Sequence, residues 1–267
     1  MILFPNAKIN IGLNIVSKRV DGYHNLESIF YPIEIKDALE VIEADKLKFS
    51  SSGIAIPGNT EENLCLKAYH LLKNDFKDLP SINIHLHKHI PIGAGLGGGS
   101  SDASFFIKLL NQKFSLGLEL FQMENYASKL GSDCAFFIQN KPAYATEKGD
   151  QLRPVNLDLT DYFIVLVMPE VQVSTAEAYQ GICASPSAVP LSELIKLPIE
   201  QWKLCIKNDF EPSVFSKYPS IANIKMQLYE AGALYASMSG SGSSVYGIFQ
   251  QKLKFPQLEQ KYKLFYL

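Results

Sequence analysis

The chain has 267 residues, of which 47% are hydrophobic, so it can form the core of one large domain or two ordinary ones. Its 25 basic and 27 acidic residues give a net charge of −2 without a long basic run, which argues against nucleic acid as a partner. No apolar run reaches the roughly 18 residues of a membrane span, and the N-terminus lacks a signal-peptide pattern. We therefore expect a cytoplasmic globular protein that does not bind membranes.

The first 45 residues are typical of antiparallel strands. Residues Ile9 to Val16 alternate between apolar and polar types, and two further β-rich runs lie between Leu26 and Ile42. Asp21-Gly22 between them is a strong hairpin signal. On pattern alone, the Tyr23-His24 pair that follows is an ordinary turn exit.

A helix and a strand are expected next. Residues Glu61 to Phe76 carry apolar side chains at helical spacing, and Ile82, Ile84 and Leu86 alternate with polar residues. Three histidines, at positions 85, 87 and 89, share the polar face of that strand. A metal site there is conceivable, but plain polar alternation gives the same pattern, and no nearby acidic residue completes a ligand set.

The stretch Pro91 to Ala103 reads P-I-G-A-G-L-G-G-G-S-S-D-A, with glycine at five of seven successive positions. Glycine is costly in regular structure, so these residues indicate unusual backbone conformations or close approach of a ligand. Apolar spacing after the stretch predicts a helix that begins at about Ser100 or Ser101. A glycine segment that leads into a helix N-terminus is typical of a phosphate site.

A second helix is expected over Leu120 to Leu130, with Gly131 as its C-terminal cap. Asp133 follows, between this helix and the apolar run Ala135 to Ile138, and is either a cap or a catalytic group. The four cysteines form no C-x-x-C pair, which favours buried free thiols, although a reactive Cys134 remains an alternative; they are Cys65, Cys134, Cys183 and Cys205.

The remainder divides into shorter predicted elements. Polar residues from Arg153 to Thr160 suggest a domain junction before a buried strand at Tyr162 to Met168. Ser174 is expected to cap a helix that carries Tyr179. The predictions that follow are a mobile loop at 184–198, helices at 199–208 and 220–230, and a tight glycine turn at 239–244 between two strands.

The glycine stretch alone leaves several functions open. It is not a Walker A loop, because no lysine follows Gly98. Gly93, Gly95 and Gly98 match G-x-G-x-x-G, so an NAD-dependent oxidoreductase is an alternative, although the preceding 90 residues lack a βαβ pattern. The serines beside the glycines favour a nucleoside triphosphate with magnesium. A third possibility is a nucleotide-binding module without catalysis.

Three blocks together resemble the GHMP kinase superfamily: P-N-A-K-I-N-I-G-L at Pro5 to Leu13, the glycine stretch, and M-S-G-S-G-S-S-V-Y-G at Met238 to Gly247. Within it, R-V-D-G-Y-H-N-L at Arg19 to Leu26 resembles the branch that phosphorylates a cytidine diphosphate derivative of methylerythritol in the non-mevalonate isoprenoid pathway. The resemblance implies an α+β fold with a ribosomal protein S5 domain 2-like domain at residues 1–155 and a ferredoxin-like domain at 156–267. It also implies ATP and Mg²⁺, with a monomer or weak homodimer.

The resemblance also implies roles for individual residues. Asp133 would be the catalytic base and Lys8 its cationic partner, while Asn63 would lie on the adenine side. The residues expected to surround the triphosphate are Pro91, Gly93, Ala94, Gly95, Leu96, Gly97, Gly98, Gly99, Ser100 and Ser101, with either serine near magnesium. Asp102 stands where many relatives have asparagine, which we expect to matter little because the backbone of the loop contacts the phosphates.

The cytidine-containing substrate would be bound by a separate set of residues. His24 would pair with the polar edge of cytosine, while Tyr23, and by a looser match Tyr179, would offer a stacking face. Asn10 would contact the substrate near Lys8. Gly240 and Gly242 would let the third block approach the methylerythritol or diphosphate. The resemblance implies no firm metal ligand, so the metal residues stay unknown.

Overall fold

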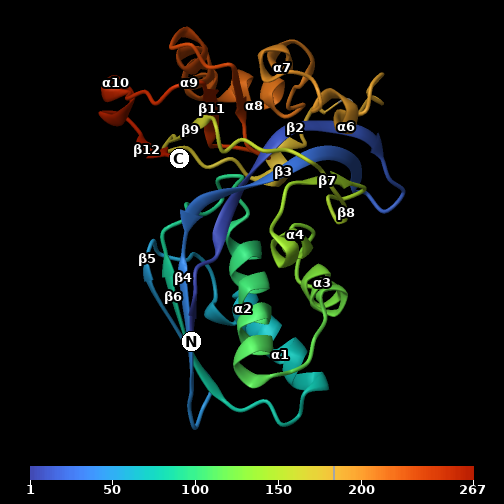
Figure 1. Cartoon of the computed structure of the whole chain (residues 1–267), viewed down its shortest axis with the longest axis vertical. Coiled ribbons are helices and arrows are strands. Elements are labelled where there is room, and N and C mark those ends of the chain that lie inside the picture. Colours follow the sequence, from blue (N-terminus) through green and yellow to red (C-terminus); the bar gives the residue numbers. More distant parts are fainter. Residues whose placement is uncertain (183) are drawn as a thin grey trace. The chain divides into compact units, whose positions relative to one another are not determined.

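The computed structural model describes residues 1–182 and 184–267. The chain forms two compact units that are not consecutive segments. Unit 1 consists of Met1–Lys8, Pro32–Ile92 and Gly97–Lys141, and unit 2 of Ile9–Tyr31, Gly93–Leu96 and Pro142–Leu267. Helices and mainly antiparallel sheets occur in both, which confirms the α+β class (Figure 1). The division at residue 155 stays a prediction.

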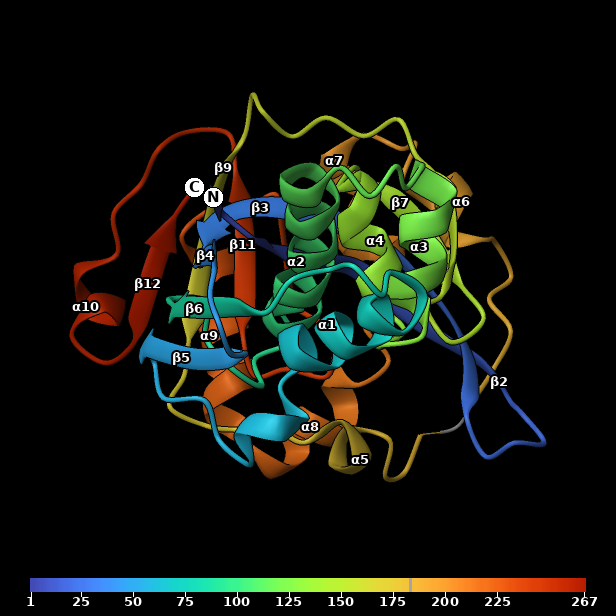
Figure 2. The ribbon, with the colours of Figure 1, turned by 90° about the horizontal axis from the view of Figure 1, so that it is seen from below.

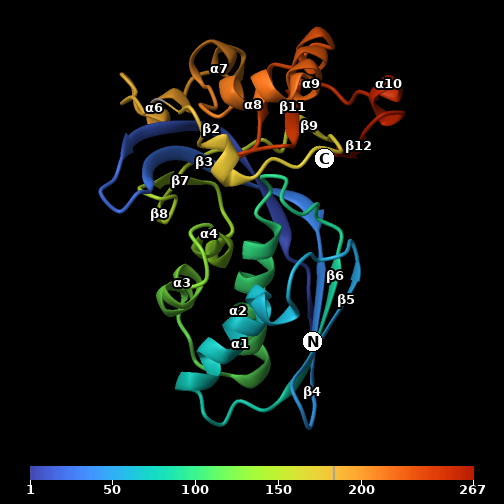
Figure 3. The ribbon, with the colours of Figure 1, turned by 180° about the vertical axis from the view of Figure 1, so that it is seen from behind.

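Unit 1 is a sheet with helices on one face. Strands β1 (Ile2–Leu3), β4 (Ala38–Glu43), β6 (Ile82–Lys88) and β5 (Lys48–Gly53) lie in that order, and β6 is antiparallel to β4 but parallel to β5. One face buries Ile82, Ile84 and Leu86, as the alternation predicts. Helices α1 (Leu64–Asp75) and α2 (Gly98–Phe114) pack on that face, and α3 (Leu120–Ser128) and α4 (Cys134–Gln139) pack against these helices on the side away from the sheet (Figures 2 and 3).

The helix ends in unit 1 differ from the sequence expectations for local reasons. A short 3-10 helix (Thr60–Glu62) precedes α1, which begins at Leu64 because the Asn63 side chain accepts a hydrogen bond from the Cys65 amide at 2.9 Å. Helix α2 begins at Gly98, two residues before Ser100. The expected cap at Gly131 is wrong, because α3 ends at Ser128 with Lys129 as its C-cap.

Unit 2 contains two four-stranded sheets. One has the order β2 (Asn6–Lys18), β3 (His24–Lys36), β7 (Ala143–Thr146) and β8 (Gln151–Pro154), and unit 2 includes the parts of β2 and β3 between Ile9 and Tyr31. The expected turn joins β2 to β3, where the Arg19 amide donates to the Tyr23 carbonyl at 2.8 Å. The other sheet has the order β10 (Tyr235–Met238), β11 (Val245–Phe249), β9 (Phe163–Met168) and β12 (Lys263–Tyr266), all antiparallel.

Among its described residues, unit 2 contains one longer helix, α9 (Pro219–Glu230), and several short ones. The short helices are α5 (Thr175–Ala178), α6 (Leu191–Leu194), α7 (Ile199–Cys205), α8 (Glu211–Lys217) and α10 (Pro256–Glu259). Ser174 caps α5 as expected, by accepting from the Glu177 amide at 3.1 Å, but Tyr179 is the C-cap of α5 rather than a residue within it. The loop expected at 184–198 contains α6. Ser239 to Ser244 does connect two strands, β10 and β11.

The cysteines are mostly as expected. Cys65 and Cys134 are free and buried, and Cys205 is free and half-buried. Cys183 lies outside the described residues. Burial raises the pKa of the Cys134 thiol to about 11. The thiol is therefore protonated at neutral pH, which argues against a reactive Cys134.

Candidate active site

Lys8 and Asp133, both in unit 1, form an ion pair. The Lys8 ammonium lies 3.3 Å from a carboxylate oxygen of Asp133, and the Lys8 side chain is only 4% exposed whereas that of Asp133 is 30% exposed. Asp133 immediately precedes α4, yet its side chain accepts no capping hydrogen bond from that helix. This geometry disfavours the interpretation of Asp133 as a simple cap. A half-exposed carboxylate beside a buried ammonium can instead accept a proton from a hydroxyl group.

The start of α2 lies against Lys8. A Cβ atom at Gly97 would be 3.3 Å from Cε of Lys8 and 3.0 Å from the Phe137 ring, and Gly97 has a φ of +69°. Only glycine fits both the conformation and the space. The first N–H groups of a helix lack intrahelical acceptors and carry partial positive charge, so this end of α2 suits an anion.

Two serines and one asparagine expected near the nucleotide lie in the same unit. Ser101 is fully buried, and its hydroxyl has no hydrogen-bond partner among the described residues. Ser100 is half-buried and lies beside Cys134, since its hydroxyl interacts with that thiol. The side-chain oxygen of Asn63 is engaged as the cap of α1, which leaves its amide group as the part that could face adenine.

In unit 2, the middle of the glycine stretch binds to the turn between β10 and β11. The carbonyl of Ala94 accepts from the Ser244 hydroxyl at 2.5 Å, and that of Gly95 accepts from the Ser239 hydroxyl at 2.8 Å. A Cβ atom at Gly240 would lie 3.3 Å from both the Asn10 side-chain oxygen and Cα of Gly95. The structure thus brings together residues from all three sequence blocks that resemble the superfamily.

Asn10 and Gly242 hold the turn between β10 and β11 in place. The Asn10 amide N–H donates to Ser239 at 3.1 Å, and the Asn10 side chain donates to Ser28 at 2.8 Å. Gly242, at φ +93°, packs against Met238, where a Cβ atom would be 2.7 Å from the sulfur. Gly242 therefore serves the packing of the turn.

The aromatic residues expected to hold the base are partly assembled in unit 2. The rings of His24 and Tyr179 are stacked with centroids 4.8 Å apart and planes 19° apart. Phe210 supports Tyr179 edge-on at 4.8 Å. Tyr23 is 63% exposed, with the Lys148 ammonium 5.5 Å from its ring centroid. Tyr179, whose match to the family pattern is loose, thus lies directly against His24.

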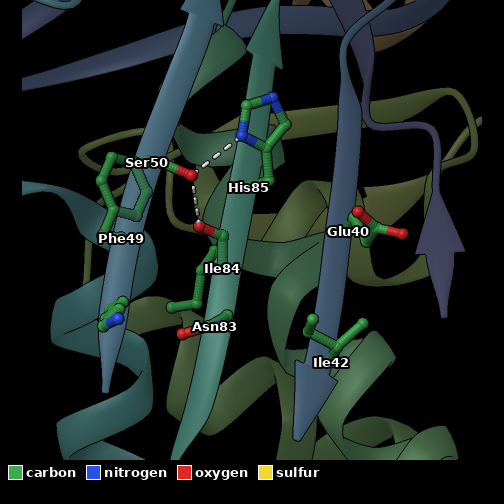
Figure 4. A pocket seen from close by; sticks show the side chains of 8 residues that line it. Glu40, Ile42, Phe49, Ser50, Asn83, Ile84 and His85 are labelled. Atoms are coloured by element: carbon green, nitrogen blue, oxygen red, sulfur yellow. Dashed lines mark hydrogen bonds between the residues drawn. The ribbon is translucent and has the colours of Figure 1, made fainter. Parts of the chain in front are cut away.

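The histidines of β6 lie on the polar face of the unit 1 sheet. His85 shares hydrogen bonds of 2.9 Å with the hydroxyls of Ser50 and Ser52, and His87 shares one with Ser52. A shallow pocket of about 550 Å³ opens beside His85 and is lined on β4 and β5 by Glu40, Ile42 and Phe49, among others (Figure 4). Within the described part of the chain, no three His, Cys, Asp or Glu side chains form a group that could hold a metal ion.

Two buried residues that were not singled out from the sequence, Asn208 and Lys88, make contacts that hold the segments of the predicted site. Asn208 is buried and donates at 2.9 Å to the carbonyls of both Met238 and Gly240. Lys88 is buried between two aspartates in unit 1. For Lys88 a signal existed, because it follows Ile82, Ile84 and Leu86 on the buried face of the strand, where a cation needs a partner. No sequence signal marks Asn208.

Comparison with known proteins decides the family. The model of the GHMP kinases N terminal domain matches residues 63–141, and that of the GHMP kinases C terminal region matches residues 191–266. A 4-diphosphocytidyl-2-C-methyl-D-erythritol kinase of Bacteroides fragilis is 53% identical over 263 residues, which cover 97% of this chain and 96% of the relative. The chain belongs to the 4-diphosphocytidyl-2-C-methyl-D-erythritol kinase family.

Other members of the 4-diphosphocytidyl-2-C-methyl-D-erythritol kinase family agree. The relative from Parabacteroides distasonis is 51% identical over 96% of this chain and 94% of its own length, and that from Cytophaga hutchinsonii is 53% identical over 94% and 93%. A crystal structure of 4-(cytidine 5'-diphospho)-2C-methyl-D-erythritol kinase matches with a TM-score of 0.84 at 27% identity, over all of this chain and 98% of the other. The expected superfamily and its fold are confirmed.

More distant kinases share the fold alone. A homoserine kinase from Cytophaga hutchinsonii matches with a TM-score of 0.65 at 16% identity, over 98% of this chain and 94% of that structure.

Among the described residues, no helix has the length and apolar character to cross a membrane.

Proposed function

We propose that this kinase transfers the terminal phosphoryl group of ATP to the 2-hydroxyl of 4-diphosphocytidyl-2-C-methyl-D-erythritol. Membership of the family makes the chain an ATP-dependent kinase of the non-mevalonate isoprenoid pathway. The observation that carries the finer proposal is the Lys8–Asp133 pair at 3.3 Å beside the glycine-rich start of α2. This arrangement supports the proposal that Asp133 accepts a proton next to a phosphate site at the start of α2.

The phosphoryl donor would occupy the start of α2. Phosphoryl transfer requires mainly positioning and charge stabilisation, and the backbone N–H groups after Gly97 supply both. Glycine at 97 lets the loop approach Lys8 closely, so the Lys8 ammonium can also stabilise charge that develops on the transferred group. The residues proposed to contact the triphosphate remain those of the stretch from Pro91 to Ser101, with Asn63 on the adenine side.

Asp133 would accept the proton of the attacking hydroxyl. Its partial exposure leaves the carboxylate accessible to a substrate, while the contact with Lys8 fixes its orientation. The Ser132 hydroxyl donates to the other carboxylate oxygen at 3.3 Å. One carboxylate oxygen thus contacts Lys8, and the other accepts from the Ser132 hydroxyl, which a substrate hydroxyl could replace.

Unit 2 would bind the cytidine-containing substrate. The stacked pair of His24 and Tyr179 offers an aromatic surface and an imidazole edge, and the exposed Tyr23, next to His24 in the chain, adds a third ring. Stacking on a base contributes about 1–3 kcal/mol. Asn10 and Gly240, which approach each other in the same unit, would contact the rest of the substrate, and Gly242 would act by shaping the turn.

We further propose that Mg²⁺ accompanies ATP. Magnesium prefers oxygen ligands, and the buried Ser101 hydroxyl, which lacks a partner among the described residues, fits such a ligand at the start of α2, with Ser100 as the neighbouring candidate. The ion would supply positive charge to the phosphates. We also propose that the protein acts in the cytoplasm as a monomer or weak homodimer.

A coupled ADP-release assay tests the substrate. Purified protein with ATP and Mg²⁺ would be offered 4-diphosphocytidyl-2-C-methyl-D-erythritol, mevalonate, homoserine and galactose in parallel. We expect turnover with the cytidine-containing alcohol and background rates with the others. Turnover of mevalonate, homoserine or galactose without turnover of the cytidine compound would assign the protein to another kinase of the superfamily.

A further inference from the structure

Three charged side chains form a buried cluster in unit 1 that the proposed reaction does not use. The Lys88 ammonium contacts a carboxylate oxygen of Asp37, and lies 2.7 Å from a carboxylate oxygen of Asp102. All three side chains are at most 5% exposed. Charged groups so deeply buried are expensive unless each is paired, so the cluster restrains the segments that carry it.

Two of those segments flank the loop formed by residues 91 to 97. Lys88 is the last residue of β6, just before Pro91, and Asp102 lies in the early part of α2, just after Ser101. Asp37 lies between β3 and β4, and its second carboxylate oxygen accepts from the backbone amides of His89 and Ile90 at 2.6 and 2.8 Å. The cluster therefore binds the chain immediately before and after the loop to one common point.

Apolar packing joins the same two ends. A Cβ atom at Gly98 would lie 2.9 Å from Cγ2 of Ile90 and 3.4 Å from the Lys88 ammonium. Because Gly98 has no side chain, the first residue of α2 packs directly against Ile90, whose backbone N–H donates to Asp37. Residues 91 to 97 are consequently a loop whose ends are fixed against each other by an ion cluster and by a close glycine contact.

We propose that Lys88, Asp37 and Asp102 are positioning residues that hold the glycine loop in its phosphate-binding form, and that the Lys88–Asp102 contact sets the affinity for ATP. This inference rests on the proposed function, because it assigns ATP to that loop. None of the three side chains needs to touch the nucleotide. They act by fixing where the backbone N–H groups at the start of α2 point.

The cluster has an uneven distribution of hydrogen bonds. Asp37 has partners for both carboxylate oxygens, whereas one oxygen of Asp102 has none among the described residues. A single acceptor atom at position 102 therefore suffices to bind Lys88. An asparagine side chain can supply that acceptor, but an alanine or valine side chain cannot.

The test compares Asp102→Ala with Asp102→Asn in steady-state kinetics and in direct ATP binding by calorimetry. We expect Asp102→Ala to raise the KM and Kd for ATP about tenfold or more, since small displacements of positioning groups have effects of that order. The KM for the alcohol substrate should stay near that of the unaltered protein. Asp102→Asn should restore ATP affinity, because it retains the acceptor for Lys88.

Leu72→Ala is the matched control, because Leu72 is a fully buried residue of α1 in the same unit. It should lower the melting temperature without changing the KM for ATP. Should Asp102→Ala fail to fold, Asp102→Val would be measured in its place, because valine fills the space without an acceptor. Equal ATP affinity in the Ala or Val variant and the unaltered protein would overturn this inference alone, as would an Asn variant as weak as Ala. An unaltered protein that binds no ATP would overturn the proposed function as well.

Discussion

The proposed role of Asp133 follows from the absence of a capping hydrogen bond between its side chain and α4. Asp133 lies at the position before α4 where an aspartate ordinarily caps the helix, yet it contacts Lys8 and accepts no capping bond. Lys8 is nearly inaccessible, so the exposed edge of the pair belongs to the carboxylate. A substrate hydroxyl would therefore meet Asp133 and not Lys8.

Asp133→Asn tests this role. An amide keeps the size of the side chain but is a far weaker base, so kcat should fall by about 10²-fold or more, the usual contribution of a general base. Affinity for ATP should persist. Steady-state ADP release measures kcat, and calorimetry measures the affinity for ATP. Asp75→Asn, which changes an exposed aspartate on α1, is the control. A variant with nearly full kcat would remove Asp133 from catalysis.

Asp102 makes stability depend on pH. Burial, with Asp37 as a second negative charge nearby, holds the pKa of the Asp102 carboxyl well above its usual range, although Lys88 opposes the shift. The folded protein thus binds this proton more tightly than the unfolded chain does. The resulting stabilisation is complete below the unfolded pKa of about 4 and is lost as the pH rises through the folded pKa.

Asp102→Asn should remove this dependence. Asparagine does not ionise, so the free energy of unfolding of the variant relative to the unaltered protein should increase as the pH rises from about 4 toward 8. Urea unfolding at several pH values in that range measures the difference. A difference that is constant, or that shrinks with rising pH, would contradict the raised pKa of Asp102.

At the scale of elements, different glycines of the glycine stretch are required for different structural reasons. Gly95 and Gly93 both have positive φ, at 75° and 68°. A Cβ atom at Gly95 would overlap the carbonyl of Ser239, whereas one at Gly93 would meet nothing within 4 Å. Position 95 thus requires glycine because the backbone closely approaches the β10–β11 turn, whereas position 93 favours glycine only because of its positive φ.

Alanine at the two positions should separate these effects. Both variants carry the cost of a left-handed conformation, about 1–2 kcal/mol. Gly95→Ala should lose about 1–3 kcal/mol more, because its methyl group must displace the turn. Chemical denaturation measures both free energies of unfolding, with Gly93→Ala as the matched control. Equal losses would show that the turn yields to Gly95→Ala without strain.

The same elements show what the sequence reveals. The glycine stretch, the hairpin at Asp21-Gly22 and the helix after Ser101 are predictable because each has a strong local pattern. The strands β7, β8 and β12 and the helices α8 and α10 are too short for periodicity to reveal them. At the site, Lys8 and Asp133 are far apart in sequence and lack a mutual pattern, so only family resemblance pairs them. Asn208 acts through partners thirty residues away or more, which no local pattern encodes.

At the scale of the whole molecule, nucleotide binding should stabilise the fold. A ligand that binds only the folded state raises the free energy of unfolding by about 2.7 kcal/mol at a hundredfold excess over its Kd. ATP with Mg²⁺ should therefore raise the melting temperature in a concentration-dependent manner, whereas NADH should not. Differential scanning fluorimetry with both nucleotides measures this. Stabilisation by NADH alone would revive the dinucleotide-binding interpretation of Gly93, Gly95 and Gly98.

The interleaving of the two units has a consequence for synthesis on the ribosome. The chain passes from one unit to the other after Lys8, Tyr31, Ile92, Leu96 and Lys141. All of unit 1 has been translated by Lys141, but the strands β2 and β3 must wait for β7 and β8 before their sheet is complete. The edge of β3 that β7 covers in the folded protein therefore has no partner strand until Ala143 has been translated, and an open strand edge can pair with other chains in the meantime.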